Sequence, residues 1–114
     1  MQQSESQQKI VMDKLDYLEK RRLKIVRTYP ELKQEFDYHY LSMLVILSRD
    51  AAATKESIKT TRYMLKQYFS KDEKCKIDFA LRRQLFALRH RSVEKILQKH
   101  QDMVYMKEEH QYFE

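Results

Sequence analysis

The chain has 114 residues, a formal net charge of +6, a single proline (Pro30) and no glycine. An average soluble domain of this length carries about eight glycines and about six prolines. Glycine supplies the positive φ of tight hairpin turns and lets backbone approach a phosphate, so the composition excludes P-loops, dinucleotide-binding turns and Asn-Gly hairpins. The length and a hydrophobic content of 42% suit one modest core, and therefore a single domain over residues 1–114.

The first predicted helix begins after Ser4 or Ser6, either of which can cap it, and ends near Arg27. Residues 1–6 are expected to fray. Apolar residues recur along this helix with a period close to 3.6, as on a helix with one face in a core. The apolar stripe consists of Val11, Leu15, Leu18, Ile25 and Tyr29, interrupted by Arg22.

A second helix is predicted to begin at Pro30, because proline is favoured at the first helical position and Glu31 suits the positive end of the helix dipole. One face carries Leu32, Phe36, Tyr40, Met43 or Leu44, and Leu47. Residues 41–47 are apolar except for Ser42, which indicates the central helix of the core. Residues 48–50 are compatible with a turn or with a continued helix, and we place a break at residues 50–54.

Three further stripes follow this break. The third helix carries Ile58, Thr61, Leu65, Tyr68 and Phe69. Residues 70–73 (SKDE) match the capping box, in which a serine and a glutamate accept free N–H groups, so a fourth helix is predicted to start near Lys71. Its inward residues are Ile77, Leu81, Leu85 and Leu88, with Phe79 and Phe86 widening the face.

The last predicted helix begins after Ser92, which is expected to cap it. Its inward positions are Val93, Ile96 and Leu97, and residues 106–114 are expected to fray. Every apolar stripe in the chain has a helical period and no turn suits a hairpin. The sequence therefore predicts an all-α fold, a compact bundle of four to five helices.

No catalytic or metal-binding constellation is visible in the sequence. The histidines, His39, His90, His100 and His110, are never three or four residues apart, so no zinc motif is present. We interpret His39 as half-buried on the flank of the second helix. Among the closest carboxylate pairs, Glu35 and Asp37 diverge by about 200° on a helix, and Asp13 and Asp16 are interpreted as surface charge. We therefore expect no catalysis by this chain alone, no bound metal and no cofactor.

The single cysteine, Cys75, is predicted to lie in the fourth helix beside Lys74 and Lys76. We interpret it as a small core residue, although neighbouring cations would also suit a reactive thiol of lowered pKa. A lone cysteine favours a reduced, cytosolic compartment. Neither a signal peptide nor a membrane span is expected, because the longest apolar run, residues 41–47, is far shorter than the roughly 20 residues that a span needs.

Positive charge collects in two stretches, residues 20–27 and residues 71–99. Such stretches attract nucleic acid, anionic lipid or an acidic partner, and they also occur as ordinary solvated helix faces. Tyrosine and phenylalanine interleaved with arginine can stack on bases, but most of these aromatic residues lie on the apolar stripes and are interpreted as core. The candidate anion-binding residues are Lys20, Arg21, Arg22, Lys24, Arg27, Arg82, Arg83, Arg89, Arg91, Lys95 and Lys99.

Several segments together resemble a known family. They are residues 15–21 (LDYLEKR), 25–32 (IVRTYPEL), 36–43 (FDYHYLSM), 69–77 (FSKDEKCKI), 86–88 (FAL) and 92–97 (SVEKIL). These segments form, in order, a basic helix, a Tyr-Pro-Glu-Leu turn, a Tyr- and Leu-rich helix and a lysine-rich capped helix. This order resembles the helical C-terminal region of family 2 glycosyltransferases from Gram-positive bacteria. The resemblance covers about residues 10–100. It implies no catalytic residue here, because the nucleotide-sugar domain and the Asp-x-Asp metal motif of those enzymes are absent from this sequence.

The function expected from these observations is a non-catalytic helical interaction or accessory module in the cytoplasm, including the inner face of the membrane. Its expected partners are another protein or its own catalytic domain, an anionic membrane surface, nucleic acid and a second copy of the chain. The alternative is a small basic regulator of phage or plasmid type that binds nucleic acid through the six candidate residues of the second stretch. Against this alternative, the sequence has no recognisable helix-turn-helix.

Overall fold

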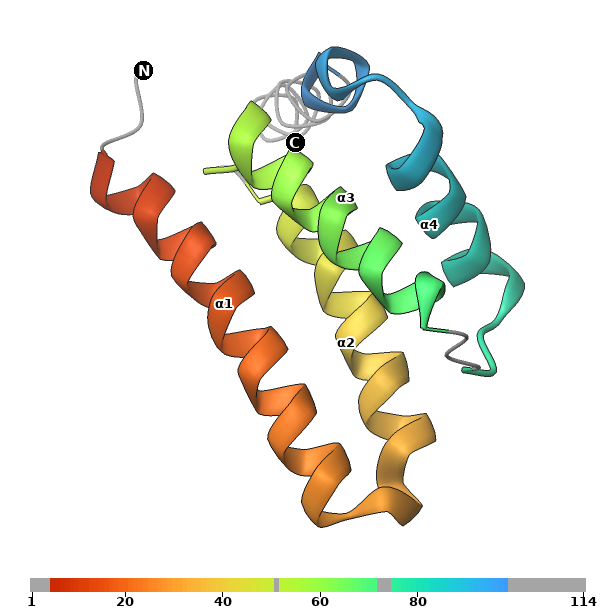
Figure 1. The fold of residues 1–114 in the computed structure, drawn as a ribbon. Helices are drawn as coiled ribbons and strands as arrows, with labels where there is room; N and C mark the ends of the chain where they lie inside the picture. The colour runs from red at the N-terminus through yellow and green to blue at the C-terminus, as the bar shows by residue number, and fades with distance from the viewer. Residues whose placement is uncertain (1–4, 51, 72–74, 99–114) are drawn as a thin grey trace, which may run out of the picture.

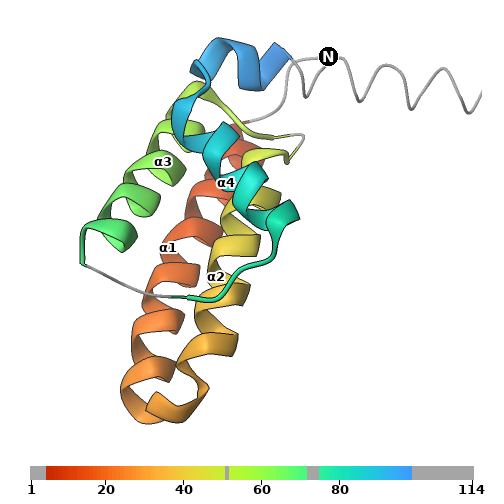
Figure 2. The same ribbon diagram turned by 90° about the vertical axis from the view of Figure 1, so that its right-hand side faces the viewer.

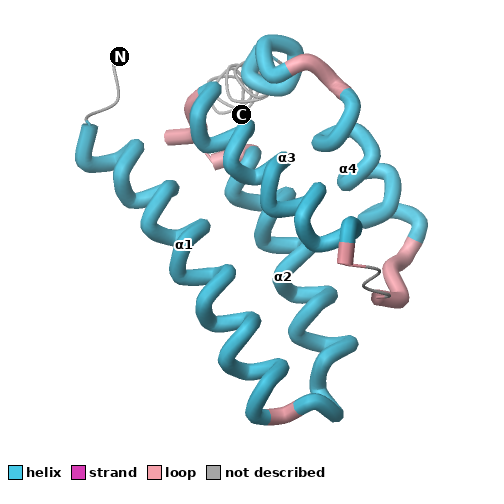
Figure 3. The backbone as a smooth tube through the Cα atoms, in the orientation of Figure 1, coloured by secondary structure: helices cyan, strands magenta, loops and turns pink. Residues whose placement is uncertain are grey.

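A computed structural model describes residues 5–50, 52–71 and 75–98, and all its regular structure is helical. The elements are α1 (Glu5–Thr28), the short 3₁₀ helix η1 (Pro30–Leu32), α2 (Lys33–Ser48), α3 (Lys55–Ser70) and α4 (Phe79–His90). Residues 93–98 form a further short helical segment. No strand occurs among the described residues, which confirms the predicted all-α bundle (Figure 3).

The central helix is α2, which contacts α1, α3 and α4. In Figure 1, α1 and α4 lie on the two outer sides of the molecule, with α2 and α3 between them. Figure 2 shows α4 in front of α2 when the same molecule is seen from the side. The order of the layers means that the two ends of the sequence supply opposite surfaces of the bundle.

The apolar faces of the helices meet to form the core, and α2 is buried on most of its sides. The buried apolar residues of α2 are Tyr40, Leu41, Leu44, Val45 and Leu47. They pack with Val11, Leu15 and Leu18 of α1, Ile58, Leu65 and Tyr68 of α3, and Leu81, Leu85 and Leu88 of α4. Most of the predicted stripe positions are therefore confirmed. Tyr29 is an error, because its side chain is 51% exposed beyond the end of α1.

The first two connections are built without glycine. Helical structure begins at Pro30 as predicted, but its first turn is the 3₁₀ helix η1, in which the N–H of Leu32 donates to the carbonyl of Tyr29 at 3.0 Å. The predicted break at residues 50–54 is also confirmed. There Thr54 Oγ1 accepts from the N–H of Ser57 at 3.1 Å, while Ser57 Oγ accepts from the N–H of Thr54 at 2.8 Å. This reciprocal capping box fixes the start of α3.

The predicted start of the fourth helix near Lys71 is wrong. Ser70 is the last residue of α3, and its hydroxyl donates back to the carbonyl of Gln67 at 2.8 Å instead of capping a new helix. The N-cap of α4 is Asp78, whose Oδ1 accepts from the N–H of Leu81 at 3.0 Å. Residues 75–78 are not helical, so Cys75 does not lie in a helix.

The inward residues of α4 are the predicted leucines, but Phe79 and Phe86 point away from the core with 78% and 65% of their surfaces exposed. At 100° per residue these two positions lie on the side of the helix roughly opposite Leu88, so they cannot widen the buried face. The cap predicted for the next segment is confirmed, since Ser92 Oγ accepts from the N–H of Lys95 at 3.2 Å. Of the ends predicted to fray, residues 1–4 and 106–114 lie outside the described residues, whereas the prediction is wrong for residues 5 and 6, which belong to α1.

Candidate functional site

The candidate basic residues of α1 separate into an exposed group and one buried residue. Lys20, Arg21, Lys24 and Arg27 are exposed. Lys20 Nζ lies 2.9 Å from Asp16 Oδ2, and this hydrogen bond together with the carboxylate charge raises the pKa of Lys20. Arg22 is only 6% exposed, so its assignment to an anion-binding surface is wrong. It occupies a position on the apolar stripe and points into the bundle.

Arg22 is the centre of a buried polar cluster that joins three helices. Its Nη1 lies 3.4 Å from Oδ1 of Asp37, a carboxylate of α2 that is completely buried. Its guanidinium carbon lies 4.7 Å from the centre of the Tyr40 ring and 5.3 Å from that of the Tyr68 ring. A cation over two aromatic faces in a desolvated place is stabilised by the ring quadrupoles. We use the name buried cluster for Glu19, Arg22, Lys33, Asp37, Tyr40 and Tyr68.

The remaining members complete the contacts of the two carboxylates. Oδ2 of Asp37 accepts from Lys33 Nζ at 2.5 Å and from the Tyr68 hydroxyl at 3.0 Å. Glu19 accepts a short hydrogen bond from the Tyr40 hydroxyl. Burial raises the pKa of Tyr40, and the contact with Glu19 raises it further, so its hydroxyl stays protonated as a donor. Among the described residues, only Nε of Arg22 is a buried side-chain polar atom without a hydrogen-bond partner.

The segment before α4 lies against the same end of α2. The Gln34 amide makes two hydrogen bonds to the backbone of Lys76, donating to its carbonyl at 2.7 Å and accepting from its N–H at 2.8 Å. Cys75 Sγ lies 3.7 Å from the carbonyl of Gln34. Burial and the nearby charge of Asp37 raise the pKa of the Cys75 thiol, which argues against a reactive thiol of lowered pKa. Cys75, interpreted from the sequence as a small core residue, is only partly buried and packs against the core.

The buried cluster is a structural feature and lacks the geometry of an active site. Both carboxylates are already engaged by donors, which leaves neither as a free general base. Neither of the two surface hollows described below is lined by a member of the cluster. Within the described residues, no group of three or more His, Cys, Asp or Glu residues could hold a metal ion. His39, predicted to be half-buried, is in fact exposed.

The other candidate residues surround α4. Arg82, Arg83, Arg89, Arg91 and Lys95 are all exposed, and Lys99 lies outside the described residues. The two exposed phenylalanines lie on the same surface, so the assignment of these rings to the core is wrong. We use the name α4 outer face for Phe79, Arg82, Arg83, Phe86, Arg89 and His90. The helix between its caps contains no acidic residue.

The structure does not bring the candidate residues of the two basic stretches together. The exposed candidate residues of the first stretch lie on α1 and those of the second stretch lie on and after α4, which are on opposite sides of the bundle (Figure 1). A single flat anionic surface therefore cannot contact both groups of candidate residues at once. Each must be tested as a separate candidate.

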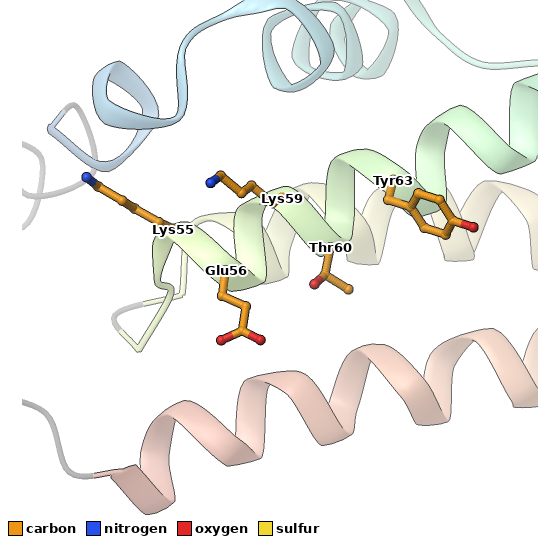
Figure 4. A pocket seen from close by; sticks show the side chains of 5 residues that line it. All are labelled: Lys55, Glu56, Lys59, Thr60 and Tyr63. Carbon is orange, nitrogen blue, oxygen red and sulfur yellow. The ribbon is translucent and has the colours of Figure 1, made fainter.

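Two open hollows lie elsewhere on the surface. The first, of about 480 Å³, is lined by the α3 residues Lys55, Glu56, Lys59, Thr60 and Tyr63. Figure 4 shows Glu56 and Thr60 pointing toward α1, and Lys55 and Lys59 leaving the other side of α3. The second, of about 200 Å³, lies between α2 and α4 and is lined in part by Tyr38, Ile46, Asp78 and Gln84. Neither set contains a nucleophile beside a base with an orienting partner, the arrangement that covalent catalysis requires.

In comparison with known proteins, no family model, no curated protein and no solved structure matches this chain. Among the helices that the structure describes, none combines the length and the apolar run that a membrane span requires. The sequence reasoning identified the basic residues around α4 but missed the buried cluster. The signal for this cluster in the sequence is helical phase. Arg22 and Asp37 each fall on the buried side of their helix, and their charges are opposite.

Proposed function

We propose that this chain is a non-catalytic helical module that associates with another protein or with an anionic membrane surface. The observation that carries the proposal is the α4 outer face, where two exposed phenylalanines lie among arginines on a helix without acidic residues. Exposed apolar side chains grouped on one face, with charge around them, are typical of interaction surfaces. The resemblance to the helical C-terminal region of family 2 glycosyltransferases supports the same class of role, with a catalytic domain as one partner.

The alternative is a basic regulator that binds nucleic acid. The same face favours it in one respect, because exposed aromatic rings beside arginine can stack on unpaired bases. Against it, the sequence has no recognisable helix-turn-helix that would present a helix to the major groove. We therefore rank it second and include nucleic acid among the probes below.

The test compares two variants that remove equal charge from opposite sides of the bundle. One is Arg82→Gln with Arg83→Gln on the α4 outer face, and the matched control is Arg21→Gln with Lys24→Gln on α1. All four side chains are exposed, so neither variant should unfold the chain. Arg22 is left unchanged because it is buried.

Binding is measured by cosedimentation or fluorescence anisotropy at about 0.15 M salt. The probes are phosphatidylglycerol vesicles, single-stranded DNA and polyglutamate. Each arginine near an anionic surface contributes about fivefold in affinity, so the α4 variant should lose about tenfold or more on at least one probe. The α1 variant should lose much less. The proposal fails if neither variant alters binding to any probe, or if the isolated chain transfers or hydrolyses a nucleotide sugar.

A further inference from the structure

The α4 outer face has the shape of a ridge. Phe79 and Phe86 are the two most exposed large apolar residues of the described chain, at 78% and 65%. They are seven residues apart, so they lie within about 20° of the same line on the helix and about 10 Å apart along its axis. Both rings therefore project from one crest, on the side of α4 that faces away from Leu81, Leu85 and Leu88.

Positive charge lies on both sides of this crest. By helical phase, Arg82 and Arg89 lie on one side of the phenylalanines and Arg83 lies on the other. The guanidinium of Arg89 is 4.9 Å from the centre of the Phe69 ring, which holds it at the α3 side of the ridge. Asp78, which precedes Phe79 in the sequence, caps α4. From Arg82 to Arg89 the ridge carries only positive charge and is therefore complementary to an anionic partner.

The convex form of the ridge favours one kind of anionic partner. The hollow beside α4 is lined by Ala80, Leu81 and Gln84, which lie away from the crest, and neither phenylalanine lines it. A protein partner would have to supply a groove for both rings, whereas the interfacial region of a bilayer accepts a convex apolar edge and supplies phosphates for the flanking arginines. Figure 2 shows α4 on the outside of the bundle, with no described segment in front of it.

We propose that the α4 outer face binds an anionic lipid bilayer, with α4 parallel to the membrane, Phe79 and Phe86 inserted among the lipid headgroups, and Arg82, Arg83 and Arg89 paired with lipid phosphates. This inference rests on the proposed function and identifies the partner of the module. With only two inserted rings and a few arginines, the attachment is reversible and depends on the anionic lipid content.

The first experiment separates insertion from charge. Phe79→Ser with Phe86→Ser is compared with Tyr17→Ser with Tyr63→Ser, a control whose rings are 64% and 61% exposed elsewhere on the surface. On vesicles of phosphatidylcholine with phosphatidylglycerol, the phenylalanine variant should bind at least about tenfold more weakly and the tyrosine variant within about twofold of the wild type. Both variants should keep wild-type unfolding curves, since all four rings are exposed.

The second experiment measures directly whether the α4 outer face inserts into the bilayer. The chain has no tryptophan, so Phe86→Trp introduces a single tryptophan on the crest and Tyr17→Trp introduces one on α1, and excitation at the red edge of indole absorption avoids the tyrosines. Anionic vesicles should shift the emission of the first variant to the blue and leave the second unchanged. Polyglutamate and single-stranded DNA should shift neither.

The possible results are distinguishable. If the phenylalanine variant binds vesicles like the wild type, or both tryptophan variants shift equally, insertion through α4 is wrong, while association through the α4 arginines can still stand. If the arginines of α4 govern binding to DNA or polyglutamate and vesicles bind no better than these soluble anions, the partner is not a bilayer. If no probe binds the chain, both the inference and the proposed function fail.

Discussion

The buried cluster and the α4 outer face both combine arginine with aromatic rings, but in opposite surroundings. In the first, Arg22 is enclosed by two tyrosine rings and paired with Asp37, and 6% of it is exposed. In the second, arginines and phenylalanines project into solvent and only Arg89 touches a ring of another helix. The difference comes from helical phase, because Arg22 is aligned with buried residues whereas the crest of α4 lies opposite its leucines. Composition alone cannot distinguish a structural arginine from one available to a ligand.

The largest expected effect is on the buried cluster. Asp37→Ala removes the carboxylate that Arg22 and Lys33 contact and leaves the buried Arg22 with only Glu19, 3.9 Å away, as a counter-charge. Loss of one partner of a buried ion pair costs about 3–5 kcal/mol, which is a large part of the stability of a small domain. Urea unfolding followed by circular dichroism measures the change. A loss under about 1 kcal/mol would mean that water reaches Arg22 and that the cluster is not dry.

A double variant sharpens the same point. Arg22→Met with Asp37→Leu replaces the two most buried charges by apolar side chains of similar size, so neither of them is left without the other. It should recover most of the stability that Asp37→Ala loses. If instead the double variant is as unstable as Asp37→Ala, shape and the tyrosine contacts matter more than charge in the cluster.

A smaller effect is expected when one hydrogen bond is removed. Tyr68→Phe keeps the ring over Arg22 but deletes the hydroxyl that donates to Asp37 Oδ2 at 3.0 Å. A hydrogen bond to a charged group contributes about 1.5–3 kcal/mol. The counterpart on the α4 outer face, Phe86→Ser, should change the free energy of unfolding by less than about 0.5 kcal/mol because its ring is exposed. Equal effects in the two variants would contradict the contrast between the two regions.

Substitutions at two residues near helix ends test where α3 begins and ends, and therefore where α4 can start. Thr54→Ala breaks the capping box that begins α3 and should cost about 1 kcal/mol. Ser70→Ala should cost less than about 0.5 kcal/mol, since Ser70 ends α3 and caps nothing. Thermal unfolding of both variants under the same conditions provides the comparison. A larger loss for Ser70→Ala would restore the helix start near Lys71 that the sequence suggests.

The smallest effect concerns the thiol beside the buried cluster. Burial and the charge of Asp37 raise the pKa of Cys75, so the thiolate forms at a higher pH than in an unfolded chain. The rate of alkylation by iodoacetamide should therefore rise with pH along a curve displaced to higher pH relative to the same chain in denaturant. A displacement to lower pH would mean that the neighbouring lysines outweigh Asp37.

Much of the fold was predictable because the local signals agree with the packing. The period of Val11, Leu15 and Leu18, and the apolar run centred on Leu44, indicated the buried faces that the structure contains. The error at α4 arose where two local signals competed. Residues 70–73 satisfy the spacing of a capping box, but the Ser70 hydroxyl bonds within α3 and Asp78 caps the helix instead, a choice that depends on how the connecting segment packs on α2.

The candidate sites were only partly predictable, for a related reason. The arginines of α4 were identified from the collection of positive charge in the sequence, but the same argument also selected Arg22, which is buried. The pairing of Arg22 with Asp37 requires knowledge that α1 and α2 are neighbours with those two positions at the same level, which a sequence does not state. Likewise, Phe79 and Phe86 were assigned to the core because phenylalanine is usually buried, whereas phase places them outside.

Arg62 connects α3, which contributes to the buried cluster, with the C-terminal end of α4, which carries the α4 outer face. From α3 it donates to the carbonyl of Leu88 through Nε at 3.0 Å and to the carbonyl of Arg91 through Nη2. These carbonyls at the end of α4 would otherwise be satisfied by solvent and would fray readily. Because a neighbouring helix holds these carbonyls, the last turn of α4 should fray less than a helix end whose carbonyls are bonded only to water. Amide hydrogens near Leu88 are therefore expected to exchange more slowly than those of such a free helix end.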